Sequence, residues 1–182
     1  MKHALRATFA AVGLMACGVA SAQAQTLVTL PDSSQTTTLT ANVSEQARVT
    51  VPSTVTFNVT NVGASTAAGA ASVTVNNIVL ATATKQLRVS VQAAAAAFTP
   101  PVGGATTWAA ADVSWNAATW TNATGVAGTL SNVSFQQVST CDANAAACST
   151  TGLVFTLAAN SGVQRSGSHT LSVTWKFESI GS

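Results

Sequence analysis

Apolar and polar side chains alternate with a period of two along most of this chain, and this pattern constrains the fold more than any other feature. The alternation recurs in short runs, among them Leu39/Ala41/Val43, Val55/Phe57/Val59, Leu87/Val89/Val91, Leu153/Phe155/Leu157 and Leu171/Val173/Trp175/Phe177. Successive side chains of an extended strand point to opposite faces, so each run predicts a strand with one buried and one solvated face. Such strands are typical of antiparallel sheets.

Turn-forming residues separate these runs. Gly, Asn, Ser and Pro gather in residues 61–70, 99–107, 122–128, 141–152 and 159–167, where they favour turns between short strands. The pattern predicts an all-β domain of roughly seven to nine strands, arranged as a two-sheet antiparallel β-sandwich of immunoglobulin-like or jelly-roll-like type. The alanine-rich piece at 92–101 is compatible with one turn of helix or with a strand extension.

The first 24 residues have the composition of a secretory signal peptide. Lys2 and Arg6 supply the positive start, residues 9–19 are apolar, and small residues follow at 20–24, the order that such signals share. An alternative is a lipoprotein signal with Cys17 as the lipidated residue, which would tether the chain to a membrane. We expect an exported protein of the periplasm, cell surface or extracellular space, with no integral membrane segment after cleavage.

Charge is scarce and balanced in the remaining chain. Without the signal, the chain contains five basic residues (Arg48, Lys85, Arg88, Arg165, Lys176) and five acidic residues (Asp32, Glu45, Asp112, Asp142, Glu178). No basic stripe is left to neutralise phosphates, which argues against a nucleic-acid partner. A nearly neutral surface of Thr, Ser, Asn and Ala favours association with other protein surfaces.

Two cysteines, Cys141 and Cys148, follow the signal and lie seven residues apart. An even number of cysteines in an exported chain predicts one disulfide. The alternative, a two-cysteine metal or redox site, has neither CxxC spacing nor a nearby histidine to support it.

Residue types that perform catalysis are nearly absent. His169 is the one histidine after the signal, tyrosine does not occur, and the carboxylates are scattered singly. A Ser-His-Asp triad or a glycosidase pair needs several such groups together. Asp142 and Asn144 are more typical of a turn than of a Ca²⁺ loop. We expect no enzyme, and no catalytic, metal or cofactor site.

Four tryptophans divide into two pairs. Trp115 and Trp175 alternate with aliphatic residues and are expected in the core, whereas Trp108 and Trp120 lie in polar connections. Exposed indoles there would stack on sugar rings, as in a carbohydrate-binding module; the alternative is partial burial at the rim of the sandwich.

Several segments carry a resemblance to known exported proteins. The stretches "TLTANVSEQARVTVPSTVTFNVTNV", "DVSWNAATW", "GTLSNVSFQQVST" and "LVFTLAANSGVQRSGSHTLSVTWKF" resemble a family of poorly characterised exported bacterial β-sandwich proteins. The chain is also loosely similar to pilin and spore-coat-U-like subunits of chaperone–usher systems. That similarity implies a subunit that lacks one strand and accepts the extended N-terminal segment of the next subunit.

The N-terminal part of the chain contains a candidate for this donated strand. Leu39, Ala41 and Val43 share one face within residues 25–43, and "PDSSQTTT" precedes them as a candidate hinge. The alternative is a first strand that pairs within its own domain, here residues 44–182, because consecutive strands usually pair locally. The closing strand, 171–177, is expected to be a central strand of the sandwich.

These observations favour a non-enzymatic structural protein. We expect a subunit of a bacterial surface filament, coat or matrix, associating with itself or with other surface subunits. The alternative function is a carbohydrate- or surface-binding module.

Overall fold

The structure is a computed structural model that describes residues 27–181. The predicted signal peptide and Cys17 lie outside the described residues. The chain divides into two compact units, Met1–Ala41 and Asn42–Ser182. In the first unit, residues 27–41 form no helix or strand and are mostly exposed. The second unit contains all the strands of the described chain.

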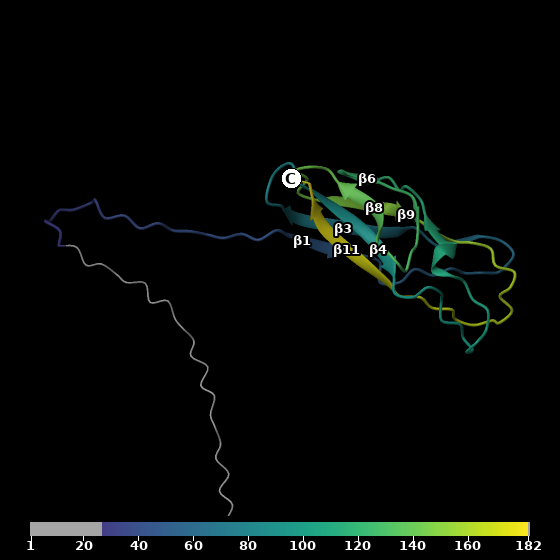
Figure 1. Ribbon diagram of the computed structural model, residues 1–182. Coiled ribbons are helices and arrows are strands. Elements are labelled where there is room, and N and C mark those ends of the chain that lie inside the picture. The colour runs from purple at the N-terminus through teal and green to yellow at the C-terminus, as the bar shows by residue number, and fades with distance from the viewer. Residues whose placement is uncertain (1–26, 182) are drawn as a thin grey trace, which may run out of the picture. The chain divides into compact units, whose positions relative to one another are not determined.

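Eleven strands and one turn of 3-10 helix form the second unit (Figure 1). They are β1 (Gln46–Thr50), β2 (Thr66–Ala67), β3 (Ala71–Val79), β4 (Gln86–Ala93), η1 (Ala110–Asp112), β5 (Val113–Trp115), β6 (Ala123–Gly125), β7 (Gly128–Thr129), β8 (Gln136–Cys141), β9 (Cys148–Leu153), β10 (Phe155–Leu157) and β11 (Val173–Ile180). Every strand pair is antiparallel. The predicted all-β antiparallel class is confirmed.

The strands form three sheets, with the orders β1-β3-β9, β2-β10-β5-β7 and β11-β4-β8-β6. The first two are consecutive parts of one layer, because Val154 alone separates β9 from β10. At this break the Asn116 side chain accepts a hydrogen bond from Val154 N–H and donates one to the Gly152 carbonyl. The Asn116 side chain thus takes the place of a backbone partner at this break. The structure has three sheets and eleven strands, whereas the sequence predicted two sheets and seven to nine strands.

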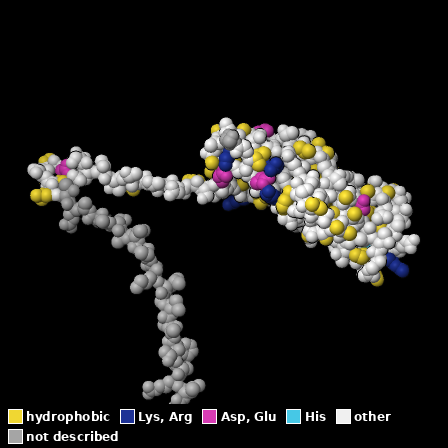
Figure 2. Space-filling model, viewed as in Figure 1, with side chains coloured by type: hydrophobic (Ala, Val, Ile, Leu, Met, Phe, Trp, Pro, Cys, Tyr) yellow, Lys and Arg dark blue, Asp and Glu magenta, His cyan; other side chains and the backbone are white. Residues whose placement is uncertain are grey.

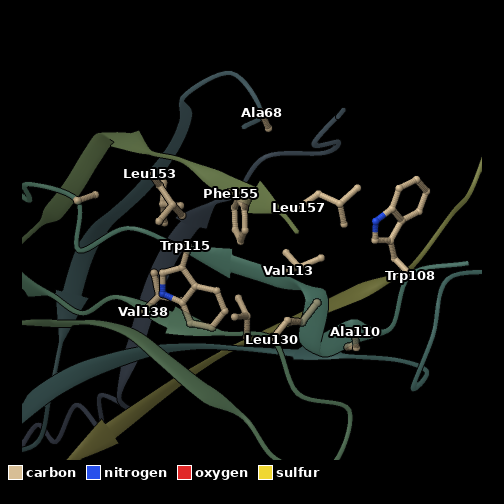
Figure 3. Close-up of a cluster of buried hydrophobic side chains, with 14 of the residues drawn as sticks. Ala68, Trp108, Ala110, Val113, Trp115, Leu130, Val138, Leu153, Phe155 and Leu157 are labelled. Carbon is tan, nitrogen blue, oxygen red and sulfur yellow. The ribbon is translucent and has the colours of Figure 1, made fainter. Parts of the chain in front are cut away.

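A continuous hydrophobic core joins all three sheets (Figure 3). Val73, Val91, Val138 and Leu153 are completely or almost completely buried, and the rings of Trp115 and Phe155 meet edge to face at 6.2 Å. These residues come from the alternating runs that the sequence shows. Burial of their apolar surface is the main contribution to the stability of the domain.

One side of the sandwich is closed by contacts between its layers. Thr121 and Ser149 exchange two backbone hydrogen bonds, of 2.8 and 3.2 Å. The predicted disulfide, Cys141–Cys148, is present and links β8 of one sheet to β9 of another. Both cysteines are buried, so the bond joins the two layers within the core.

Three sequence-based expectations differ from the structure. The closing strand, β11, is an edge strand and not a central one, since it pairs with β4 alone. Residues 55–59 alternate as predicted but belong to no strand, and residues 94–96 after β4 are exposed bends with no helix. The first two differences concern the same place in the fold, which is the open side of the sandwich.

Candidate functional site

The side of the sandwich opposite the closed one is an apolar groove. Its two walls are residues 51–62 and residues 163–175, which line a volume of about 1220 Å³. They run antiparallel: the Glu45 carboxylate accepts a hydrogen bond from Ser179 at one end, and the Val62 carbonyl accepts one from Asn160 N–H at the other. Between these ends the walls are not paired with each other.

The first wall is an extended segment without a sheet partner. Val55, Phe57 and Val59 are half-buried and pack on the core, whereas Thr56 and Asn58 point to solvent. The ladder between β1 and β3 ends at Thr50, and Pro52 follows. Proline has no N–H to donate and interrupts a ladder. Within the wall, Val59 N–H donates a hydrogen bond of 3.1 Å to the Phe57 carbonyl. The wall keeps the alternation of a strand, and its other backbone groups from Ser53 to Thr60 are available to an added chain.

The second wall is bound on one edge only. Thr170 exchanges two backbone hydrogen bonds with Thr99, and the Ser172 carbonyl accepts one from Ala94 N–H. The wall then continues into β11, which pairs with β4 along this same edge. Leu171 and Trp175 pack against the core from this wall. Its free edge faces the groove.

The floor of the groove belongs to the hydrophobic core. Trp108, Val113, Leu130, Phe155 and Leu157 line the groove and also belong to the core cluster (Figure 3). The Trp108 indole is fixed by a hydrogen bond of 2.9 Å to the Ala158 carbonyl. An apolar floor between two polar backbone edges suits an extended peptide, which pairs through its backbone and buries alternate side chains.

Polar groups gather at the end of the groove near Val163. His169 lines it, with Nδ1 2.8 Å from the Thr107 hydroxyl and Nε2 3.2 Å from the Arg165 carbonyl. The His169 ring meets the Trp108 ring edge to face at 5.2 Å. These contacts hold the imidazole in place. No carboxylate is hydrogen-bonded to it within residues 27–181, so the structure does not assemble a triad around His169.

The candidate donor residues are exposed in the structure. Leu39 is 92% and Val43 71% exposed, and Ala41 is also exposed. They form no strand. An exposed alternating segment of this kind has apolar surface available for burial against another surface.

The two candidate stacking residues are buried, so of the two alternatives that the sequence leaves open the structure shows burial and not exposed indoles. Trp108 is 5% and Trp120 8% exposed, and the Trp120 ring lies against Gly125, where an added Cβ would be 2.8 Å from the indole Cδ1. Neither ring has a face free to stack on a sugar. The carbohydrate-binding alternative thereby loses its main support.

Two further observations concern metals and membranes. Within residues 27–181, no three side chains of His, Cys, Asp or Glu lie close enough together to hold a metal ion. The same part of the chain contains no helix of the length and hydropathy needed to span a membrane. The disulfide is typical of proteins from an oxidising compartment.

The fold and groove define a β-sandwich that is closed on one side and has an apolar groove on the other. Comparison with protein-family models, with curated proteins and with solved structures gives no match. The geometry of the groove and the chemistry of the N-terminal segment therefore carry the functional argument.

Proposed function

We propose that this protein is a non-enzymatic, exported structural subunit that assembles when the N-terminal segment of one copy occupies the groove of another. The observation that carries the proposal is that one chain contains both an apolar groove and an exposed segment suited to fill such a groove. The groove lacks a strand along an apolar floor, and residues 39–43 offer an exposed strand-like segment with one apolar face. A filament, coat or matrix at the bacterial surface is the assembly that such subunits build.

The register of the chain favours donation to a second copy. Within one chain, a two-residue turn at Ser44–Glu45 would place Leu39 opposite Thr50, before the groove begins. The same hairpin would place Pro31 and the polar residues 32–35 opposite 54–58, where Val55 and Phe57 pack on the core. A second copy is free of this register, so Leu39, Ala41 and Val43 can face the floor.

Apolar burial supplies the driving force for assembly. Burying an exposed leucine or valine side chain stabilises a complex by roughly 1.5–3 kcal/mol. Backbone pairing with the free groove edges then satisfies the polar groups of the donated segment. Such a contact is sensitive to a charge on the inward face and insensitive to one on the outward face.

The test compares two single substitutions in the mature full-length chain by sedimentation velocity. Leu39→Asp places a carboxylate on the inward face and is expected to leave the protein monomeric. Thr40→Asp adds the same charge on the opposite face and is expected to assemble like the wild type. A variant without residues 25–43 should also be monomeric. Equal assembly of Leu39→Asp and wild type would overturn the proposal.

A further inference from the structure

The groove has two chemically different ends. The β1 end lies beside Gln46–Val51 and Trp175–Ile180, and the far end lies beside Thr60–Val62 and Asn160–Arg165. The chain enters the sandwich at the β1 end, because Glu45 directly precedes β1. The N-terminal segment of every copy therefore leaves its own domain from the β1 end.

Most of the charge of the domain lies around the β1 end. Four bases (Arg48, Lys85, Arg88, Lys176) and three acids (Glu45, Asp142, Glu178) are placed there, and Figure 2 shows charged side chains gathered over this part of the sandwich. Glu178 pairs with Arg88 and Lys176, and Glu45 pairs with Lys85. The bases exceed the acids by one, so the β1 end carries a small net positive charge.

Arg165 is the basic side chain that lines the far end. It is exposed, and within the described residues its guanidinium makes no hydrogen bond or ion pair. Its backbone carbonyl, by contrast, accepts a hydrogen bond from His169. A free guanidinium at the rim of an apolar groove is available to a carboxylate of whatever chain enters the groove.

The link between the donated residues and the donor's own domain is short. Ser44 and Glu45 alone separate Val43 from β1, a reach of about 10 Å for three extended residue steps. The β1 end of the donor must therefore lie against whichever end of the groove receives Val43.

The direction of the donated segment decides the kind of assembly. If Val43 lies at the β1 end of the acceptor, two β1 ends meet and each copy can fill the other's groove, which closes a symmetric dimer. If Val43 lies at the far end, the β1 end of one copy meets the far end of the next, and the chain of subunits can grow without closing. The first arrangement brings two net positive ends together, whereas the second brings one such end to the far end, where the donor's Glu45 meets Arg165. Charge complementarity favours the second.

On the basis of the proposed function, we propose that Glu45 of a donor copy pairs with Arg165 of the acceptor and fixes a head-to-tail direction of assembly. Glu45 has capacity for this contact. Its Oε1 accepts hydrogen bonds from Ala81 N–H at 2.7 Å, Lys85 at 3.0 Å and Ser179 at 3.2 Å. Its Oε2 has no hydrogen-bond partner within residues 27–181.

The test is a pair of double-mutant cycles on the association constant of the full-length mature protein at low salt. Arg165→Gln is expected to weaken association about two- to fivefold, the range of an exposed ion pair, and to have no further effect in a Glu45→Gln background. Asp32→Asn provides the second cycle, because Asp32 would reach Arg165 only if the donated segment ran in the opposite direction. Arg165→Gln should weaken association to the same extent with and without Asp32→Asn.

The matched control is Val133→Glu, which changes the net charge equally at an exposed position outside the groove and should leave association unchanged. Coupling of Arg165 to Asp32, or no coupling to Glu45, would overturn the inference and leave the proposed function intact. Species that stop at a dimer would also overturn it. If the wild type itself does not associate, or if Leu39→Asp associates normally, the proposed function fails first.

Discussion

The backbone N–H of Asn160 donates a hydrogen bond of 2.7 Å to the carbonyl of Val62, and this bond marks the far end of the open side of the sandwich. Beyond it the two walls of the groove separate, and between Val62 and Thr50 the first wall has no ladder partner. The opposite side of the sandwich, in contrast, is held by the Thr121–Ser149 pair and by a disulfide. The layers of the sandwich are therefore held together on one side and separated by an apolar groove on the other.

The disulfide should contribute to the stability of the domain. Replacing both Cys141 and Cys148 by serine is expected to lower the free energy of unfolding by about 2–3 kcal/mol, since the bond closes a short loop and its sulfurs are buried. Urea unfolding monitored by circular dichroism measures the loss. The same loss should appear when the wild type is unfolded under reducing conditions, and equal stability of oxidised and reduced protein would contradict the prediction.

Gly128 is required by the close approach of a tryptophan. A Cβ at this position would lie 2.4 Å from Cζ2 of Trp115, whose indole is held by a hydrogen bond of 2.9 Å to the Val126 carbonyl. Gly128→Ala is therefore expected to destabilise the fold by about 1–3 kcal/mol, as overpacking does. The control is Gly69→Ala, where an added Cβ meets nothing within 4 Å. Chemical denaturation of both variants should show a loss for Gly128→Ala alone.

The sequence allowed the class of fold to be predicted because alternation reports burial on one face. The runs at 87–91 and 153–157 became β4, β9 and β10, and the cysteine pair became a disulfide. Alternation does not report pairing, however. The run Val55–Val59 alternates as clearly as the run Leu87–Val91, yet its backbone has no ladder partner.

The groove residues were missed for the same reason. Phe57, Trp108 and Val163 come from segments far apart in sequence, and no local pattern indicates that they line one groove. Pro52 was the available signal, since it makes continuous pairing of the 46–59 segment unfavourable. The sequence left the burial of Trp108 and Trp120 open because both lie in polar connections. The Trp108 indole is held by the carbonyl of Ala158, 50 residues along the chain, and the Trp120 ring packs on Gly125.

The lowered pKa values of two glutamates lead us to expect that the folded domain is less stable in acid. Hydrogen bonds lower the pKa of Glu45, from Ala81 N–H first and then Lys85, and the pKa of Glu178, from Lys176 first and then Arg88. A carboxyl whose pKa is lower in the folded state stabilises the fold above its unfolded pKa. That stabilisation is lost as the pH falls through the folded value. Melting temperatures should therefore decrease below the ordinary pKa of glutamate.

The matched variant for the acid prediction is Glu178→Gln. It removes one of the two groups, so its melting temperature should depend less steeply on pH in the acid range than that of the wild type. Both glutamates are solvent-accessible, so added salt should reduce the difference between the two proteins. Identical pH profiles of Glu178→Gln and wild type would contradict the assignment of this dependence to Glu178.

Tryptophan fluorescence should report occupation of the groove. Trp175 is half-buried and lines the groove, whereas Trp115 and Trp120 are buried elsewhere. A peptide of residues 36–45 that fills the groove would exclude water from the Trp175 indole and shift its emission to shorter wavelength. We expect this shift when the peptide is added to dilute mature protein, and we expect it to be much smaller in Trp175→Phe. The same peptide with Leu39→Asp should give no shift, because its inward face then carries a charge that the apolar floor cannot solvate. A shift of equal size with both peptides would mean that binding does not depend on burial of Leu39, and it would contradict the predicted mode of binding.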